Sequence, residues 1–349
     1  MRVLVTGATG FIGGHLARYL ASDGHYVRAL VRPGNESRVS ALAEADVELA
    51  WGDITDPEAV RLAVDGMDAV FHLAAVRDVW GTPESVYQRV NVEGTRLMLD
   101  AAVDGEVQRF VYCSSVGVAR YPGNLKADEA LPFCEPTSQI LYHRSKAHAE
   151  QVVLEWARAD RVPALVVRPV ITYGPGDEWG MVTRLVMLLA QGWFVPVGNG
   201  RNHVDLVYID DLVTGMYHAW ERGDVGRVYI LSGIAPIQMQ TLIGKICGLL
   251  GKRPPHIYIP ALIARVAGWG METLDRIGNR LGIAWEGKEP IITRDKVATL
   301  TVDRGFSHKR ARRELEYRPR VDYDEGLQRT LDWLQETRFF LKNLVSWPR

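Results

Sequence analysis

The amino-acid sequence predicts an α/β fold in which a doubly wound parallel sheet carries a smaller, mixed α/β lobe at its carboxyl-terminal end. In the first half of the 349 residues, short β-rich runs alternate with amphipathic helical segments. After about Gly174 the alternation loosens, and tryptophan, glycine and proline become more frequent without any flexible linker. A chain of this length can bury one large core together with an appended lobe.

The first half contains six predicted strands, most of them separated by helical segments. The first strand ends at Gly7, and the helical spacing of Ile12, Leu16 and Leu20 indicates that a helix follows it. The strands are Val3–Val5, Tyr26–Val31, Val47–Ala50, Ala69–Leu73, Arg109–Cys113 and Leu165–Val167. The helical segments are Phe11–Leu20, Pro57–Val64, Pro83–Val103 and Leu141–Ala159. This order predicts a parallel sheet with helices on both faces.

The second half has a weaker pattern of elements. Its predicted elements are the helices Met181–Gln191, Leu212–Arg222 and Met239–Leu250 and the short strand Leu206–Tyr208. We therefore divide the chain into a main domain, residues 1–173 with a returning segment at about 200–232, and a lobe that is mainly residues 174–349.

The composition argues against several classes of protein. Lys and Arg total 41 against 42 Asp and Glu, and this balance gives no basic field for a nucleic acid. Cys113, Cys134 and Cys247 are odd in number and far apart, so we expect neither a disulfide framework nor a metal site. A reduced, cytoplasmic location fits this usage. We expect no signal peptide, and no apolar run reaches the ~18 residues that a spanning helix needs.

Three glycines follow the first predicted strand and open the first predicted helix. Gly7 permits a tight turn, Gly10 lets backbone amides approach a pyrophosphate, and Gly13 allows close packing of helix on strand. The positive end of the helix dipole adds to this attraction. The sequence therefore predicts a Rossmann-type dinucleotide-binding domain in residues 1–173. The predicted cofactor contacts in this loop are Gly7, Thr9, Gly10, Phe11, Ile12 and Gly13.

The end of the second predicted strand bears on the choice of cofactor. A site for NAD usually has an acidic residue there, which binds the adenosine ribose. Here the strand ends at Arg32, whose guanidinium suits a 2′-phosphate by charge and by fork geometry. We therefore predict NADP as the preferred cofactor. NAD is the alternative, in which Arg32 and Arg38 are solvated surface residues.

Tyr142 and Lys146 lie four residues apart on a predicted helix and therefore share one face. No other Tyr-x-x-x-Lys match occurs in the sequence. A free tyrosine has a pKa near ~10 and is a poor base at neutral pH, but a nearby ammonium favours the phenolate. Tyr142 could then exchange a proton with a substrate hydroxyl while a nicotinamide exchanges a hydride with carbon. We predict that both residues are catalytic and contact the cofactor.

Further segments follow in order along most of the chain. The segments are Gly52–Ile54, His72–Ala75, Asn91–Thr95, Ser114–Ser115, Arg168–Gly176, Val207–Asp211 and Lys309–Pro319. Together with the glycine loop and the Tyr/Lys pair, they resemble the extended short-chain dehydrogenases/reductases, the NAD-dependent epimerase/dehydratase family.

The resemblance implies several roles. Lys146 would hold the nicotinamide ribose, and Ser115 would hydrogen-bond the substrate carbonyl oxygen, with Ser114 as its rival for that role. Asp53 and Ile54 would contact the adenine. The remaining cofactor contacts implied are Leu73, Ala74, Ala75, Asn91, Pro169 and Ile171.

Subfamily features bear on the substrate. The dehydratases of the family carry an Asp-Glu pair after the catalytic hydroxyl, where this chain has Val116 and Gly117. The nucleotide-sugar epimerases have a basic residue where this chain has Val204, although Arg201 could substitute for it.

The segments Gly174–Asp177, Gly198–Gly200 and Val204–Tyr208 most resemble the 3β-hydroxysteroid dehydrogenase-like group, which includes sterol-4α-carboxylate 3-dehydrogenases. Trp80 and Trp179 are candidate substrate contacts in an apolar site, or else they belong to the lobe core. We expect reversible oxidation of a secondary alcohol on a hydrophobic, steroid-like or β-hydroxy acid substrate. A nucleotide-sugar epimerase or reductase and a non-catalytic dinucleotide sensor are the alternatives.

Two predictions concern larger partners. Relatives commonly dimerise through two helices per subunit, so the resemblance implies a homodimer formed by the helix around Val86–Val103 and the helix that carries Tyr142. The segments Ile257–Trp269 and Arg338–Trp347 are apolar with interspersed basic residues. We interpret them as lid or packing helices rather than as membrane-contacting segments.

Overall fold

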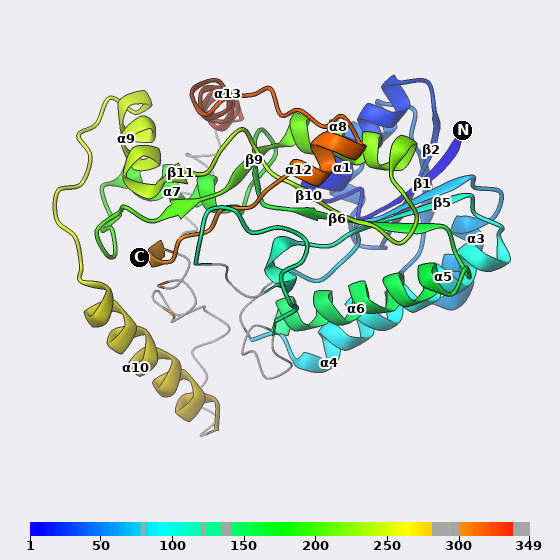
Figure 1. Ribbon diagram of the computed structural model, residues 1–349, viewed down its shortest axis with the longest axis horizontal. Coiled ribbons are helices and arrows are strands. Elements are labelled where there is room, and N and C mark those ends of the chain that lie inside the picture. The colour runs from blue at the N-terminus through cyan, green and yellow to red at the C-terminus, as the bar shows by residue number, and fades with distance from the viewer. Residues whose placement is uncertain are drawn as a thin grey trace.

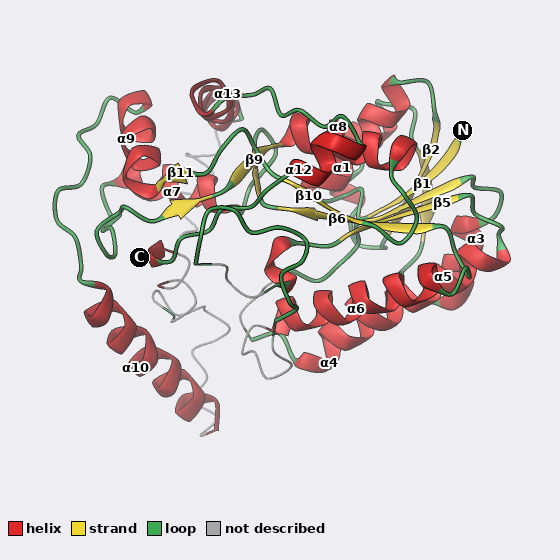
Figure 2. Cartoon of the chain, in the orientation of Figure 1, coloured by secondary structure: helices red, strands yellow, loops and turns green. Residues whose placement is uncertain are grey.

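The computed structural model describes residues 1–77, 81–119, 123–134, 141–280, 293, 297 and 300–337, with the backbone alone over 275–280. A large parallel sheet carries helices on both of its faces, and a smaller mixed lobe lies beside it (Figure 1; Figure 2). This arrangement confirms the predicted α/β fold class, with a Rossmann-type doubly wound sheet and a mixed lobe.

Seven strands of the described chain form the large sheet, and all neighbouring pairs are parallel. From edge to edge they are β10 (Val228–Leu231), β6 (Ala164–Pro169), β5 (Arg109–Cys113), β4 (Ala69–His72), β1 (Arg2–Thr6), β2 (Tyr26–Val31) and β3 (Glu48–Trp51). The chain winds outward from β1 in one direction through β3, and then in the other direction from β4. Beside such a reversal, the carboxyl ends of the strands form the crevice where doubly wound folds bind ligands.

Alternate side chains of the central strand β1 anchor a helical layer on each face. Val3 and Val5 belong to the same buried cluster as Leu16, whereas Leu4 lies in the opposite cluster with Val60. One face carries α1 (Phe11–Ser22), α8 (Ile209–Arg222) and α12 (Lys309–Glu314) (Figure 1). The other carries α3 (Pro57–Val64), α5 (Gly94–Asp104) and α6 (Leu141–Arg158).

The helix predicted over Pro83–Val103 is not uniform. It consists of α4 (Glu84–Tyr87), a π-helical stretch η2 (Gln88–Glu93) and α5. A π-helix displaces backbone hydrogen bonds and occurs often at functional sites. Here the Thr95 hydroxyl donates to the Asn91 carbonyl at 2.7 Å, which gives the displaced carbonyl a partner.

The lobe is built from short sheets and long helices. Its paired strands are β7 (Ile171–Tyr173) with β9 (Leu206–Tyr208), and β8 (His203–Val204) with β11 (Ile237–Gln238). Its helices are α7 (Met181–Gln191), α9 (Met239–Leu249), α10 (Ala261–Arg280) and α13 (Tyr323–Glu336). Strand β10 and helices α12 and α13 were not predicted from the sequence, and α10 was predicted only in part, as the lid or packing helix Ile257–Trp269. Short η1 (Glu36–Arg38) and α2 (Ser40–Ala43) complete the β2–β3 connection.

Asp205 carries a buried carboxyl group between β8 and β9. Its Oδ2 accepts a hydrogen bond from the Phe306 amide at 2.8 Å, whereas no residue of the described chain pairs with Oδ1. Burial raises the pKa of Asp205 from 3.8 to about 7. The charged carboxylate is therefore costly in the folded protein.

The substitution Asp205→Asn should stabilise the protein more at about pH 8 than at about pH 4.5. The unfolded chain loses this proton near pH 3.8, whereas the folded chain keeps it up to about pH 7. Stability therefore falls as the pH rises through this window, and a neutral amide removes that loss. In urea denaturation, the advantage of the variant in free energy of unfolding should grow by about 3 kcal/mol between the two pH values. A pH-independent difference would contradict this account.

Candidate active site

The glycine loop between β1 and α1 is shaped by close backbone contacts. Gly7 has a φ of +73°, and a Cβ there would lie 2.8 Å from the Ala74 nitrogen. A Cβ on Gly13 would lie 2.3 Å from the Gly7 carbonyl oxygen, so the helix packs directly on the loop. No side chain caps α1 at Gly10, so the first-turn amides point at the space before the helix. This backbone cradle fits the pyrophosphate of a dinucleotide.

A buried hydrogen-bonded chain links the glycine loop to the π-helix. Thr6 Oγ1 accepts from the amides of residues 73–74 at 3.2 and 3.1 Å and lies 2.8 Å from His72 Nδ1. The Thr6 hydroxyl therefore donates its own proton to His72 Nδ1. The ring proton of His72 then lies on Nε2, which donates to Thr95 Oγ1 at 3.1 Å. Burial lowers the pKa of His72 to about 3, with a smaller effect of Lys146. The imidazole is thus neutral and holds the β4 end against the glycine loop.

Asn91 ties the β4 end to the helix that carries the Tyr/Lys pair. Its Oδ1 accepts from the Val76 amide at 2.7 Å, and its Nδ2 donates to the Val76 carbonyl at 3.1 Å and to Ser145 Oγ at 2.9 Å. Ser145 Oγ in turn donates to the Tyr142 carbonyl at 2.9 Å. Asn91 is buried, so these contacts position the segment after β4 and α6 relative to each other. Its direct contact with a cofactor stays a prediction.

Lys146 lies at the carboxyl end of β5. Its Nζ donates to the Cys113 carbonyl at 2.6 Å and lies 4.2 Å from the centroid of the Tyr112 ring. Burial lowers the pKa of Lys146 to about 8, so the amine remains mainly charged at neutral pH. Burial also raises the pKa of Tyr112, with smaller contributions from Glu150 and Tyr142. Tyr142 is therefore close enough to Tyr112 to affect its pKa. It lies one helical turn before Lys146, on the same face of α6.

The two serines after β5 have different partners. Ser114 is buried, and its hydroxyl donates to Glu150 Oε2 at 2.5 Å. Ser115 is partly exposed, and its Oγ accepts from the Gly117 amide at 3.1 Å. Because that bond leaves the hydroxyl proton of Ser115 available, the geometry favours Ser115 over Ser114 as a donor to a substrate oxygen.

Glu150 and Arg168 form a buried ion pair beneath these serines. Arg168 Nε lies 3.0 and 3.1 Å from the two carboxylate oxygens, and its Nη2 lies 2.5 Å from Oε1. Both side chains are almost fully buried. The pair joins α6 to β6 and so fixes the height of the Tyr/Lys helix over the sheet.

The other predicted cofactor residues lie along the same sheet edge. Arg32 follows β2 directly and is exposed, as is Arg38 in η1. Asp53 Oδ1 accepts from the Thr55 amide and hydroxyl at 2.9 and 2.8 Å, so it shapes the turn after β3. Ile54 packs on Gly94, where a Cβ would lie 3.0 Å from Ile54 Cδ1.

The predicted nicotinamide and substrate residues lie nearer the lobe. Pro169 is buried at the end of β6, and Ile171 is partly exposed at the start of β7. Trp179 is exposed just before α7. Trp80 lies outside the described residues, so its predicted role has no structural account.

The sequence analysis missed a cluster next to Tyr142. A Cβ on Gly117 would lie 2.4 Å from His143 Nε2, so the loop after β5 packs directly on this imidazole. Burial lowers the pKa of His143 to about 4, with a smaller contribution from the positive charge of Arg304. Arg304 thus brings a cation from the carboxyl-terminal part of the chain to the start of α6. Only the position of His143 beside Tyr142 could have signalled this cluster.

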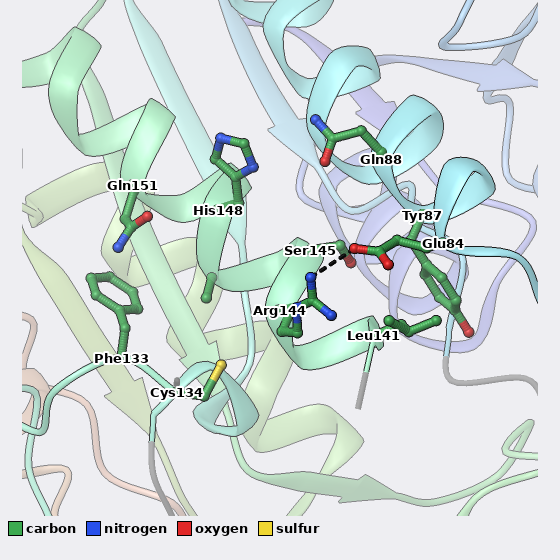
Figure 3. A pocket seen from close by; sticks show the side chains of 11 residues that line it. Glu84, Tyr87, Gln88, Phe133, Cys134, Leu141, Arg144, Ser145, His148 and Gln151 are labelled. Atoms are coloured by element: carbon green, nitrogen blue, oxygen red, sulfur yellow. Dashed lines mark hydrogen bonds and ion pairs between the residues drawn. The ribbon is translucent and has the colours of Figure 1, made fainter. Parts of the chain in front are cut away.

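A pocket of about 290 Å³ lies on the outer side of α4 and α6 (Figure 3). The ion pair between Arg144 Nη2 and Glu84 Oε1, at 2.7 Å, crosses between these helices. Among its lining residues on α6, Arg144 and His148 lie on roughly the opposite side of the helix from Lys146. This pocket is therefore distinct from the sheet edge that carries the Tyr/Lys pair.

The glycine loop, the sheet order and the Tyr/Lys helix agree with the result of a family comparison. The chain belongs to the NAD dependent epimerase/dehydratase family, whose model matches residues 3–232. It is thus an NAD-dependent oxidoreductase or epimerase of the extended short-chain dehydrogenase/reductase type.

Curated relatives match nearly the whole chain. The 2-alkyl-3-oxoalkanoate reductase of Stenotrophomonas maltophilia (strain K279a) is 34% identical over 342 residues, which cover 94% of this chain and 98% of the relative. The 3 beta-hydroxysteroid dehydrogenase/Delta 5→4-isomerase of Mycobacterium tuberculosis is 32% identical over 347 residues, which cover 95% and 90%.

Solved structures share the fold over the same length. The crystal structure of gox2253 matches with a TM-score of 0.80 at 32% identity, covering 96% of this chain and 98% of that one. The dTDP-glucose 4,6-dehydratase DesIV of Streptomyces venezuelae, solved with NAD, matches with a TM-score of 0.75 at 26% identity, covering 97% and 98%.

Proposed function

We propose that this enzyme interconverts a ketone and a secondary alcohol on a hydrophobic substrate of the steroid-like or 3-oxo acid kind. The observation that carries the proposal is the placement of Ser115 and Lys146 at the end of β5, with Tyr142 one turn from Lys146. These groups share a sheet edge with the glycine loop. The names of the curated relatives, a hydroxysteroid dehydrogenase and an oxoalkanoate reductase, support the same chemistry.

Each residue contributes a separate part of the reaction. Ser115 donates a hydrogen bond to the substrate oxygen, because its Oγ already accepts from the Gly117 amide. Tyr142 gives its phenolic proton to that oxygen in reduction and takes it back in oxidation. The charge of Lys146 stabilises the phenolate that remains. A bound nicotinamide supplies or takes up the hydride.

Arg304 favours an acidic substrate within this class. His143 is neutral at pH 7, so the guanidinium charge next to the start of α6 is not accompanied by a second cation from the imidazole. A carboxylate two bonds from the reacting carbonyl would be attracted to that charge. The relative named for 2-alkyl-3-oxoalkanoates has a substrate of this kind.

A substrate panel tests the function. Purified enzyme should oxidise NADPH with a long-chain 2-alkyl-3-oxo acid or a 3-oxosteroid, and it should use the methyl ester of the acid at least about tenfold less efficiently than the acid. The same assay with UDP-sugars as substrates tests the alternative function. Activity confined to UDP-sugars would overturn the proposal in favour of a nucleotide-sugar epimerase.

The structural features of the sugar enzymes are weak in this chain. Val204, at the position of the basic residue of the epimerases, is fully buried in β8 and cannot bind a diphosphate. Arg201 is exposed before β8 and is the remaining candidate for that role. The substitution Arg201→Ala therefore separates the two readings, since it should leave turnover of the oxo acid unchanged.

We further propose NADP as the preferred cofactor. Arg32 follows β2 at the carboxyl edge of the sheet and is exposed, which suits it to a 2′-phosphate. The substitution Arg32→Ala should raise the KM for NADPH by at least about tenfold and leave the KM for NADH within about twofold. Arg61→Ala, on the exposed side of α3, serves as the control. Equal KM changes for both cofactors, or a native preference for NADH, would contradict the proposal.

We also propose a homodimer formed by the outer faces of α4, α5 and α6, on analogy with relatives. Analytical ultracentrifugation should show a mass of two chains, and a monomer at micromolar concentration would contradict it.

A further inference from the structure

The helix α10 has an apolar face that the described part of the chain leaves uncovered. It is drawn projecting from the lobe at the lower left of Figure 1. Its Ala264 is buried in a small cluster with Val197, so one side of the helix is anchored to the lobe. Leu262 is 73% exposed and Trp269 is 58% exposed on the side away from that anchor.

The exposed residues form a continuous stripe rather than isolated positions. At about 100° per residue, they fall within an arc of about 140°. The stripe consists of Trp269, Leu262, Val266, Ile263 and Leu274, each of which is more than half exposed. Ile257, in the connection before the helix, is also exposed. An apolar surface of this kind marks a binding face for an apolar partner.

Charge selects the kind of partner. The segment from Lys252 to Met271 contains Lys252, Arg253, His256 and Arg265 but no acidic residue, and the acidic residue that follows it, Glu272, is buried. All four basic side chains are exposed. Arg265 borders the apolar stripe next to Trp269. Lys252 and Arg253 lie at the start of the connection from α9 to α10, nine and eight residues before the helix. Apolar side chains with tryptophan, flanked by cations, are typical of helices that lie in the headgroup region of anionic membranes.

No helix of the described residues is long and apolar enough to cross a membrane.

We propose that α10 docks the enzyme on the surface of a bilayer that contains anionic lipids. The stripe defined by Leu262, Val266 and Trp269 enters the boundary between headgroups and acyl chains. Arg253 and Arg265 contact the lipid phosphates. The proposal departs from the expectation that Ile257–Trp269 is a lid or packing segment, because its exposed apolar side chains do not pack on the described residues. The other segment considered for such contact, Arg338–Trp347, lies outside the described residues. The proposal goes beyond the catalytic function and does not depend on it.

Flotation of the full-length chain with vesicles tests the proposal. Vesicles of phosphatidylcholine and phosphatidylglycerol should carry the protein to the top of the gradient. About one lipid in three is the anionic phosphatidylglycerol. Pure phosphatidylcholine vesicles should bind at least about fivefold less. Arg253→Glu with Arg265→Glu should abolish that preference.

The decisive variant is Leu262→Glu, which should lower the partition coefficient at least about tenfold. Leu62→Glu on α3, where the leucine is 55% exposed, is the matched control and should bind like the native chain. Thermal melts confirm that both variants fold, and turnover of a water-soluble substrate should be unchanged in both.

Two results would overturn the proposal. One is a native chain that stays at the bottom of the gradient with both kinds of vesicle. The other is a Leu262→Glu variant that still floats but no longer self-associates, which would show that the stripe is covered by a second copy.

Discussion

Replacing Tyr142 by Phe should lower the turnover number about 10³-fold while the Kd for the nicotinamide cofactor stays within about threefold. The substitution removes the phenolic proton that passes to the substrate oxygen. It leaves the glycine loop, the Lys146–Cys113 contact and the Asn91–Ser145 brace intact. Steady-state oxidation of NADPH gives the turnover number, and fluorescence titration gives the Kd.

The matched control is Tyr26→Phe. Tyr26 begins β2 at the amino edge of the sheet, on the side away from the glycine loop, and is exposed. This variant should retain turnover within about twofold. Unchanged turnover in Tyr142→Phe would contradict the catalytic role of Tyr142 and revive the alternative of a non-catalytic dinucleotide sensor.

Replacing Glu150 by Gln should lower the free energy of unfolding by about 3–5 kcal/mol. The guanidinium of Arg168 is buried, and the amide cannot neutralise its charge. The bond from Ser114 also loses its charged acceptor. Urea denaturation measures the change. Because this pair holds α6 to β6, turnover of the folded fraction should fall as well.

Two further variants isolate the cause. Glu155→Gln, on the same helix but exposed, should change the free energy of unfolding by less than about 0.5 kcal/mol. The double substitution Glu150→Leu with Arg168→Met should recover most of the loss, since it removes both buried charges. Equal losses in Glu150→Gln and Glu155→Gln would show that the buried pair is not a main source of stability.

The sequence predicted the parts of the fold that local pattern controls. The six predicted strands correspond to strands within two residues at each end, because buried parallel strands are short apolar runs between turn signals. Strand β10 was missed since its four residues, Val228–Leu231, resemble any short apolar run. The π-helix around Asn91 was missed because α- and π-helical segments have the same composition.

The parts of the candidate site that belong to a short sequence motif could be predicted. The contacts between residues far apart in the sequence could not. The glycine loop and the Tyr142–Lys146 pair have local spacings. The chain from Thr6 through His72 to Thr95 consists of bonds between residues 66 and 23 positions apart, so no spacing reveals it. Similarly, only the structure separates Ser114, which bonds to Glu150, from Ser115. The approach of Arg304 to His143 has no local signal at all.

Transfer of deuterium to the product from NADPH deuterated at both C4 positions is the most direct test of the central claim. With a long-chain 2-alkyl-3-oxo acid, the account predicts one deuterium on the carbinol carbon for each labelled cofactor consumed, measured by mass spectrometry. An epimerase returns its hydride to the same substrate and consumes no cofactor. Epimerisation of a UDP-sugar with the label unspent, and no deuterium in any hydroxy acid, would contradict the account.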